Sequence, residues 1–250
     1  MPNKTVVITG GNKGIGYSIT SAFLESGWNV FVGSRTEGDL HKLDSSRLRH
    51  QYTDVRSHKS VQDLIFQAHS HTGSLDLLIN NAGYSEWRPL DKIDEVFLED
   101  IFATNLFSVF FACKAAASVM KTGASIINIS SIAGKRGSSN NSAYVATKFA
   151  MNGLTQSLAK ELGPREIRVN GICPVLISTD GLLSALNQKY SPSGSQKPSD
   201  FIAEFAASQA ALKRLPTGED VAAMCLFLAS KASSSITGQN INVDCGVFPQ

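Results

Sequence analysis

Residues 5–16 read TVVITGGNKGIG, and this stretch decides the fold of the chain. Its first five residues form a short, β-rich run, as expected of a strand buried on both faces of a parallel sheet. The glycines that follow lead into an amphipathic stretch, which predicts a helix from residue 15. Glycines let the backbone turn tightly and approach a pyrophosphate, and the first turn of a helix offers free N–H groups. A glycine cluster also occurs in ordinary turns, but between a buried strand and a helix it predicts a dinucleotide site.

The same alternation of short apolar runs and longer helical patterns continues along the chain. The predicted strands are residues 5–9, 29–33, 49–53, 75–79, 124–129, 168–173 and 241–243. The predicted helices are residues 15–26, 57–72, 97–120, 142–161, 199–212 and 218–230. Strands that alternate with helices imply right-handed crossovers. We therefore expect a single-domain α/β fold over residues 1–250, a Rossmann-type doubly wound parallel sheet of about seven strands with helices on both faces.

One segment departs from this pattern. Residues 190–198 read YSPSGSQKP, and their Ser, Pro and Gly content predicts a loop. The loop follows the predicted strand 168–173, on the side where ligands bind in open α/β sheets. It is either a solvated surface loop, part of a permanently docked helix pair, or functional, as long loops in compact domains often are. We expect residues 182–207 to form a lid over the substrate.

Composition excludes several classes of function. The chain has 42% hydrophobic and 18% charged residues and a net charge of +2, which argues against nucleic acid or an anionic membrane as a partner. No apolar run reaches the ~20 residues that span a bilayer, and the chain enters a strand at once, so we expect no signal peptide. The four cysteines are far apart and the histidines lack metal-ligand spacing, so we expect reduced thiols and no metal. These features favour a cytoplasmic protein.

The end of the second predicted strand indicates which dinucleotide binds. Where a cofactor without a 2′-phosphate usually meets an acid, this chain has Ser34 and Arg35. Ser34 can donate a hydrogen bond, Arg35 can pair with a phosphate, and Lys13 adds a second cation. The two cations could also be solvated surface charges. We expect NADP(H) rather than NAD(H).

Tyr144 and Lys148 are four residues apart in a predicted helix and therefore share one face. An ammonium beside a phenol favours the phenolate, so we expect the pKa of Tyr144 to fall from ~10 toward neutrality. A phenol tuned in this way can protonate a ketone or deprotonate an alcohol. Ser131, thirteen residues earlier, could hydrogen-bond the same oxygen. On its own this Tyr–Lys spacing is common at helix surfaces. The other motifs of the chain are what make it evidence for a catalytic site.

Together these motifs resemble the short-chain dehydrogenase/reductase family over nearly the whole chain. The resemblance is carried by the glycine motif 9–16, Asp54-Val55, Asn80-Asn81-Ala82-Gly83, Asn105 in TNLF, Ser130-Ser131, Tyr144, Lys148 and residues 237–244. It implies a catalytic set of Asn105, Ser131, Tyr144 and Lys148. It also implies cofactor contacts from Gly10, Asn12, Lys13, Gly14, Ile15, Gly16, Ser34, Arg35, Asp54, Val55, Asn81, Ala82, Gly83, Tyr144, Lys148, Pro174, Val175, Ile177 and Thr179.

The resemblance also implies a role for each catalytic residue. Lys148 would bind the nicotinamide ribose and lower the pKa of Tyr144, and Ser131 would hold the substrate carbonyl oxygen. Asn105 would order water in a proton path to Lys148. Hydride would pass from the nicotinamide to the carbonyl carbon while Tyr144 supplies the proton. The substrate is then a small-molecule carbonyl compound or alcohol.

Two positions depart from the family pattern. The family usually has Pro-Gly after the sixth strand, where this chain has Pro174-Val175. Valine restricts the backbone and adds two methyl groups beside the nicotinamide end, which puts the cofactor pose in doubt. Cys245 stands where glycine is common, and we interpret it as a packing change.

Several functions remain open within this resemblance. A 3-oxoacyl carrier-protein reductase would use Arg165, with help from Lys121, to bind the carrier protein, although a basic residue there is commonplace. A long lid suits a sugar, steroid or polyketide equally well. A catalytically inactive NADPH sensor or scaffold is a further class, against which the complete catalytic set argues. An enoyl reductase is disfavoured, because resembling proteins have a wider Tyr–Lys spacing.

The substrate pocket and the assembly are predicted only in outline. We expect the pocket to be lined by the lid, by residues 84–88 with Trp87, and by Arg136, Ser138, Asn140 and Asn141. Relatives commonly form tetramers or dimers through the two long helices 97–120 and 142–161. Their exposed phenylalanines would be Phe107, Phe110, Phe111 and Phe149, unless these side chains belong to the core.

Overall fold

The computed structural model describes residues 4–249, and it contains one seven-stranded parallel sheet. The strands are β1 (Thr5–Thr9), β2 (Asn29–Ser34), β3 (Leu48–Tyr52), β4 (Leu77–Asn80), β5 (Ser125–Ile129), β6 (Arg168–Pro174) and β7 (Asn240–Val243). Their order is β3-β2-β1-β4-β5-β6-β7, so the winding reverses between β1 and β4. The expected doubly wound sheet is therefore confirmed, and its carboxyl ends diverge at this reversal to leave a crevice.

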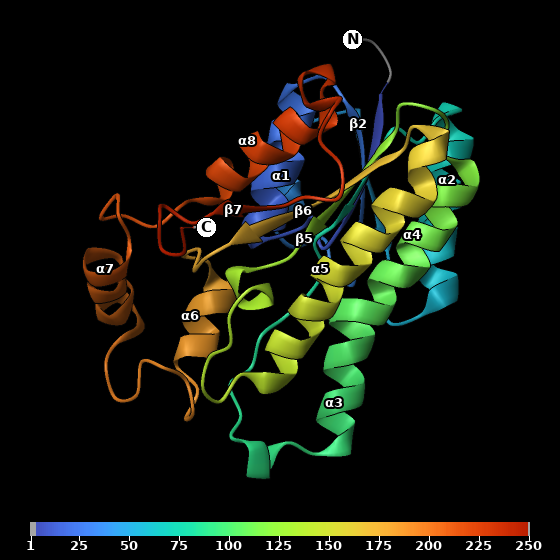
Figure 1. Ribbon diagram of the computed structural model, residues 1–250. Coiled ribbons are helices and arrows are strands. Elements are labelled where there is room, and N and C mark those ends of the chain that lie inside the picture. Colours follow the sequence, from blue (N-terminus) through green and yellow to red (C-terminus); the bar gives the residue numbers. More distant parts are fainter. Residues whose placement is uncertain (1–3, 250) are drawn as a thin grey trace.

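Helices cover both faces of the sheet (Figure 1). One face carries α1 (Gly14–Glu25) and α8 (Gly218–Ala229), which pack against each other. The other carries α2 (His58–Thr72), α4 (Ser108–Val119) and α5 (Ser142–Leu162). Beyond the sheet lie α3 (Glu95–Phe102), α6 (Asp180–Leu186) and α7 (Pro198–Gln209), with α7 outermost in Figure 1. Short 3₁₀ turns occupy Gly38–Lys42, Leu90–Lys92, Ile132–Gly134, Gly163–Arg165 and Lys231–Ser233.

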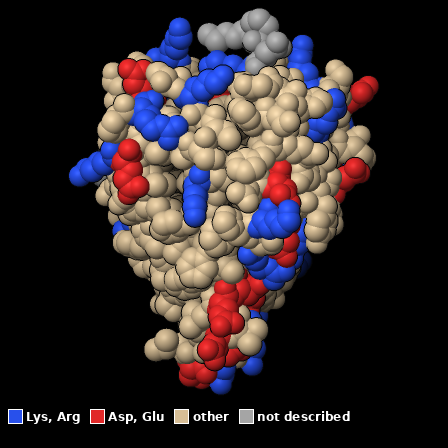
Figure 2. All heavy atoms as spheres, turned by 90° about the vertical axis from the view of Figure 1, so that its right-hand side faces the viewer, with Lys and Arg blue, Asp and Glu red and all other residues tan. Residues whose placement is uncertain are grey.

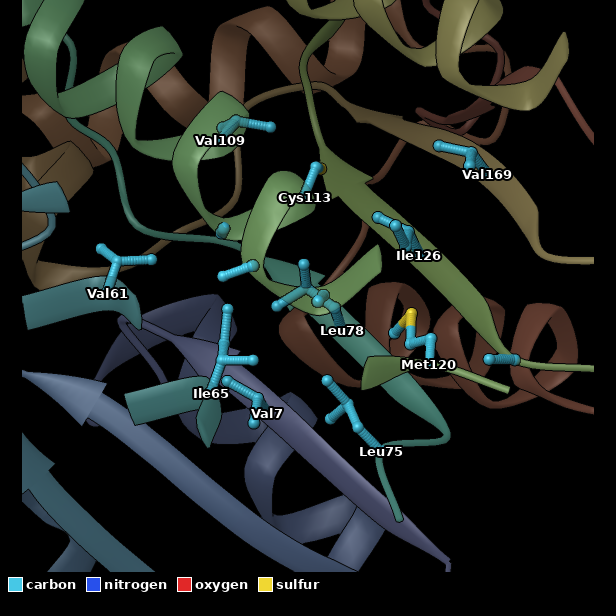
Figure 3. Close-up of a cluster of buried hydrophobic side chains, with 14 of the residues drawn as sticks. Val7, Val61, Ile65, Leu75, Leu78, Val109, Cys113, Met120, Ile126 and Val169 are labelled. Atoms are coloured by element: carbon cyan, nitrogen blue, oxygen red, sulfur yellow. The ribbon is translucent and has the colours of Figure 1, made fainter. Parts of the chain in front are cut away.

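Two apolar layers hold this arrangement together. On the α2/α4 face, Leu78 of β4 and Ile126 of β5 pack against helix residues such as Ile65 and Cys113 (Figure 3). The opposite layer joins β1, β2 and β4 to α1 and α8. The β1 residues alternate between the layers, with Val7 in the first and Ile8 in the second. Because both faces of β1 are covered by these layers, residues 5–9 are entirely buried.

The ends of the helices follow from local hydrogen bonding. Ser57 caps α2 by accepting from the Ser60 N–H, and Gly73 ends that helix with φ +78°. Thr217 and Asp220 form a reciprocal capping box at the start of α8. Such caps satisfy backbone groups that have no partner within the helix.

The structure corrects one of the predicted helices and adds another. The helix expected at residues 97–120 begins at Glu95 and is divided by a π-helical turn, Ala103–Phe107, between α3 and α4. The short helix α6 was not predicted, because its sequence, DGLLSAL, is too short for a helical period to stand out.

The continuous helical stretch Glu95–Val119 also corrects the expectation about apolar runs. By length and composition it could cross a bilayer, with a mean hydropathy of 1.6. Of its most apolar window, 44% is buried inside the protein, and core helices of soluble proteins meet the same criterion.

Candidate functional site

A cleft of about 1250 Å³ opens at the carboxyl ends of the strands, where the winding reverses. Its walls come from the segments after β1, β2, β3 and β4, from residues 177–188 and from the start of α8. Most of the predicted cofactor-binding residues line it. They are Gly10, Asn12, Lys13, Gly14, Ile15, Gly16, Ser34, Arg35, Asp54, Val55, Asn81, Ala82, Gly83, Ile177 and Thr179.

The glycine loop has the shape that a pyrophosphate requires. Gly10 adopts φ +65°, and a Cβ there would lie 3.0 Å from the Cα of Ala82. A Cβ on Gly16 would lie 2.1 Å from the carbonyl oxygen of Gly10. The Asn81 side chain fixes the loop by donating to the carbonyl oxygens of Thr9 (3.1 Å) and Gly10 (2.8 Å). Only glycine fits these positions, and the loop delivers the first turn of α1 to the cleft with no side-chain cap on its N–H groups.

Ser34 differs from the two cations, Lys13 and Arg35, in its surroundings. Ser34 is buried, and its hydroxyl donates to the carbonyl of Thr36 (2.7 Å) and lies 2.9 Å from Nε2 of His50. The hydrogen bond that we expected Ser34 to give to a phosphate is thus used inside the protein. Lys13 and Arg35 are exposed, and neither has an ion-pair partner among residues 4–249.

A charged network that sequence reasoning missed lines the next part of the cleft. Arg56 binds Asp54 through Nη2 (2.6 Å) and Asp100 through Nη1 (2.7 Å). Tyr84 donates its hydroxyl to the other oxygen of Asp100 (2.8 Å). These hydrogen bonds hold the pKa values of both carboxyl groups below their ordinary range. Nothing in the sequence links Asp100 to Arg56, which is 44 residues away.

Tyr144 and Lys148 lie together on α5, as their spacing predicts. The Lys148 ammonium is 5.6 Å from the centre of the Tyr144 ring. Lys148 is 4% exposed, and its Nζ donates to the carbonyl oxygen of Ile129 (2.8 Å), two residues before Ser131. Gly83 connects this pair to the cleft, because a Cβ there would lie 4.0 Å from Nζ of Lys148. Tyr144 also packs in one apolar cluster with Tyr84, which lines the cleft.

The pKa of Tyr144 contradicts the sequence-based expectation. Burial raises it to about 12, although a hydrogen bond with Ser131 acts in the opposite direction. Burial also lowers the pKa of Lys148 to about 8. Removal from water is the largest cause of the shift for both groups, and sequence spacing cannot reveal it. At neutral pH the structure therefore holds a neutral phenol beside an ammonium.

Asn105 lies in the π-helical turn and clamps the segment that leaves β4. Its Oδ1 accepts from the Tyr84 N–H (3.0 Å), and its Nδ2 donates to the Tyr84 carbonyl (2.8 Å). Nδ2 also lies 3.4 Å from Oγ1 of Thr147, the neighbour of Lys148 in the chain. Asn105 thus connects the cleft wall to α5. The oxygen and the nitrogen of its amide both form hydrogen bonds with other protein groups.

Five of the predicted site residues are not part of the cleft lining: Asn105, Ser131, Tyr144, Lys148 and Pro174. Val175 is also outside the lining, because its side chain is buried in a separate cluster with Ile132, Phe205 and Val247. The two added methyl groups thus join α7 and the C-terminal segment to the end of β6. Cys245, in a left-handed conformation with φ +53°, packs against the same cluster.

The predicted pocket residues have varied surroundings. Trp87 is buried against Ala185 and Leu186 of α6. Arg136 lies over the Phe248 ring, with 5.3 Å between the guanidinium carbon and the ring centre. Asn140 is exposed and accepts from the Arg88 N–H through its carbonyl (2.6 Å).

Asn141 is buried, and its Oδ1 accepts from the Ser85 hydroxyl (3.4 Å). Ser138 is exposed. Arg165, expected at a carrier-protein surface, donates to the Met120 carbonyl at the end of α4 (2.9 Å).

The connection between α6 and α7 is more ordered than its composition predicts. Ser191 and Ser193 are buried, and both hydroxyls donate to the carbonyl oxygen of Leu186 (2.6 Å each). Thr179 caps α6 by accepting from the Leu182 N–H (3.2 Å). All four cysteines are free thiols, and within residues 4–249 no cluster of three or more His, Cys, Asp or Glu could hold a metal ion.

This geometry agrees with comparisons to known proteins. A family profile described as enoyl-(acyl carrier protein) reductase matches residues 10–248. The chain belongs to the short-chain dehydrogenase/reductase family. It is 34% identical to the 3-oxoacyl-[acyl-carrier-protein] reductase of Chlamydia muridarum, over 98% of this chain and 97% of that protein. It is 35% identical to the 3alpha-hydroxysteroid dehydrogenase of Mediterraneibacter gnavus, over 98% and 96%.

A solved structure of actinorhodin polyketide ketoreductase with NADPH superposes with a TM-score of 0.88 at 26% identity, over 98% of this chain and 97% of that chain. The present protein is thus a nicotinamide-dependent oxidoreductase that interconverts a carbonyl group and an alcohol.

Proposed function

We propose that this oxidoreductase uses NADP(H) and reduces a ketone or aldehyde, with Tyr144 as the proton donor. The observation that carries the proposal is the pairing of the Tyr144 phenol with the buried Lys148 ammonium, beside a cleft with a dinucleotide-shaped glycine loop. The raised pKa of Tyr144 supports this direction of reaction, because the phenol keeps its proton at neutral pH.

Each catalytic residue has a distinct role in this proposal. When bound, the nicotinamide cofactor supplies the hydride. The Ser131 hydroxyl holds the substrate oxygen, and the Tyr144 phenol gives that oxygen its proton. The Lys148 ammonium binds the ribose hydroxyls and stabilises the phenolate that is left. Asn105 holds the Tyr84 segment in place, a positioning role that its two bonds to the Tyr84 backbone support.

The preference for NADP(H) rests on Lys13 and Arg35. Both side chains line the cleft and are exposed, and neither forms an ion pair within the described chain. By contrast, Arg56 is neutralised by Asp54 and Asp100. Two unpaired cations that line one cleft, Arg35 directly after β2 and Lys13 in the glycine loop, suit a 2′-phosphate. The NADPH in the ketoreductase structure named above adds support by analogy.

Three other functions have weaker support. A carrier-protein substrate, suggested by the name of the chlamydial relative, finds little support in Arg165, whose guanidinium donates to the end of α4. Enoyl reduction, suggested by the name of the family profile, is disfavoured by the four-residue spacing from Tyr144 to Lys148. An inactive scaffold would not need Ser131, Tyr144 and Lys148 together.

We also propose that the chain forms a dimer or tetramer through α4 and α5. Phe107, Phe110 and Phe149 are 46–49% exposed, and such exposed phenylalanines indicate a contact surface. Figure 2 faces this side of the molecule and shows large uncharged areas between scattered charged side chains. Phe111 is half-buried against the core and is not part of this surface.

Three expectations about organisation remain proposals. Residues 1–250 act as one dinucleotide-binding and catalytic domain. Residues 182–207 close over the substrate, supported by a small apolar cluster in which Leu182, Tyr190 and Phe201 pack together with Trp87 from outside the segment. The free thiols favour a cytoplasmic location.

The direct test is the oxidation of NADPH, followed at 340 nm, with a panel of ketones and aldehydes. NADH in parallel reports the cofactor preference. We expect consumption with at least one carbonyl compound and a higher kcat/KM for NADPH. Tight NADPH binding without turnover on any carbonyl compound would favour the scaffold instead.

A further inference from the structure

Four polar side chains along one wall of the cleft form a continuous hydrogen-bonded chain. The guanidinium of Arg56 donates to Asp54 through Nη2 (2.6 Å) and to Asp100 of α3 through Nη1 (2.7 Å). The second carboxylate oxygen of Asp100 accepts from the Tyr84 hydroxyl (2.8 Å). All four residues line the cleft. Because Asp54 follows β3 and Tyr84 follows β4, the chain spans the wall between the ends of these two strands.

Tyr84 is fixed at three points by this chain and by Asn105. The Asn105 amide accepts from the Tyr84 N–H through Oδ1 (3.0 Å) and donates to the Tyr84 carbonyl oxygen through Nδ2 (2.8 Å). Asp100 holds the other end of the residue, the phenolic hydroxyl. A side chain anchored at its backbone and at its tip has little freedom to turn, as is required of a group that supports a site.

The anchored residue lies beside the catalytic pair, Tyr144 and Lys148. It follows Gly83, where a Cβ would lie 3.1 Å from Oδ1 of Asn105 and 4.0 Å from Nζ of Lys148. The side chains of Tyr84 and Tyr144 belong to one apolar cluster. A shift of the Tyr84 ring would therefore be transmitted to Tyr144 through the packed side chains of that cluster. Its buried members are Phe97, Ile101 and Ala143.

Stability alone does not account for this chain. The side chains of Arg56 and Asp100 are 42% and 38% exposed, and ion pairs that are this exposed contribute little to stability. A phenylalanine at position 84 would fill the same apolar contacts without Asp100. We propose that Tyr84 is a positioning residue: Asp100 and Arg56 hold its hydroxyl, so that its ring keeps Tyr144 and Lys148 in the geometry for proton transfer. This inference rests on the proposed carbonyl reduction.

The test separates the chemical step from cofactor binding. Tyr84→Phe, Asp100→Ala and the double variant are assayed at saturating NADPH with the carbonyl compound that wild type reduces fastest. In each single variant kcat should fall by about tenfold or more, because a misplacement of ~1 Å can cost ~10²-fold in rate. The double variant should lose about as much as one single variant, because both changes break the same hydrogen bond. The dissociation constant for NADPH should stay within about threefold of wild type.

Further variants separate positioning from packing. Asp100→Asn keeps a polar partner for the Tyr84 hydroxyl and should retain more of the wild-type kcat than Asp100→Ala. Tyr52→Phe is the matched control for the lost hydroxyl, because Tyr52 is 67% exposed and does not line the cleft. Glu99→Ala is the control for Asp100, since Glu99 is its exposed neighbour on α3 and also lies outside the lining. Both controls should keep the wild-type kcat, and thermal unfolding should show that Tyr84→Phe is folded at the assay temperature.

The contrary outcomes are distinct. A wild-type kcat in Tyr84→Phe would overturn the positioning role while leaving carbonyl reduction intact. Losses of kcat that multiply in the double variant would show that the two residues act separately, which also overturns the inference. So would weaker NADPH binding at an unchanged kcat, because the chain would then serve the cofactor alone. If wild type reduces no carbonyl compound, the proposed function fails, and the inference fails with it.

Discussion

The ammonium of Lys148 donates a hydrogen bond of 2.8 Å to the carbonyl oxygen of Ile129, and both residues are buried. Because burial lowers the pKa of Lys148 to about 8, the folded state carries this charge at neutral pH at a cost in stability. Lys148→Met should therefore raise the free energy of unfolding at pH 7 by about 1–2 kcal/mol, even as activity is lost. Urea unfolding of both proteins measures the difference.

The pH dependence of that difference has a definite sign. Between about pH 8 and the ordinary lysine pKa of 10.5, the unfolded chain binds the proton that the folded chain has released. Wild-type stability relative to Lys148→Met should therefore recover as the pH rises through this window. A variant that is less stable than wild type at pH 7 would contradict the buried-charge interpretation.

The second prediction concerns Arg35, which is exposed on the cleft without an ion-pair partner in residues 4–249. Arg35→Ala should weaken NADPH binding about tenfold or more and leave NADH binding nearly unchanged, because a hydrogen bond to a charged group contributes ~1.5–3 kcal/mol. Fluorescence titration with each cofactor measures both affinities. Arg47→Ala is the control, since Arg47 is also exposed and does not line the cleft. Equal losses for the two cofactors would remove Arg35 from phosphate recognition.

Asn105 provides the third prediction. Asn105→Ala leaves the N–H and carbonyl of Tyr84 without their partner and should destabilise the protein by about 2–3 kcal/mol. It should also lower kcat more than it weakens NADPH binding, because the displaced segment lies beside Lys148. Denaturant unfolding and steady-state kinetics test both effects. Asn187→Ala, at an exposed site outside the cleft, is the control. Unchanged kcat at reduced stability would leave Asn105 with a structural role alone.

The fourth prediction uses the network of Arg56 with Asp54 and Asp100. Both carboxyl groups have lowered pKa values, chiefly through hydrogen bonds with Arg56, so their stabilising effect is present at neutral pH. It should be lost as the pH falls below their ordinary value of 3.8. Arg56→Met should therefore be less stable than wild type at pH 7, by about 1 kcal/mol or less because Arg56 is 42% exposed. Thermal unfolding from pH 7 to pH 3 should show the two proteins converge, and a constant difference would exclude this linkage.

The sequence predicted the sheet and the glycine loop because both depend on local patterns. Within twelve positions, residues 5–16 contain an apolar strand followed by glycines that lead into a helix. The structure has β1 and α1 where this pattern predicts them. It failed where a residue's environment comes from distant parts of the chain. The pKa of Tyr144 is set by burial under other elements, and the partner of Arg56 at Asp100 is 44 residues away. Ser34 was expected to bind the cofactor because a serine hydroxyl can donate to a phosphate. Its residue type does not reveal that this hydroxyl donates to the Thr36 carbonyl instead.

The central claim is that the Tyr144 phenol donates the proton, and Tyr144→Phe tests it most directly. The variant keeps the ring and its apolar contacts while it removes the hydroxyl. With a ketone that wild type reduces, kcat should fall by about 10²–10⁴-fold, the usual contribution of a positioned general acid. The dissociation constant for NADPH, measured by fluorescence, should stay within about threefold of wild type. Wild-type turnover by Tyr144→Phe would contradict the account.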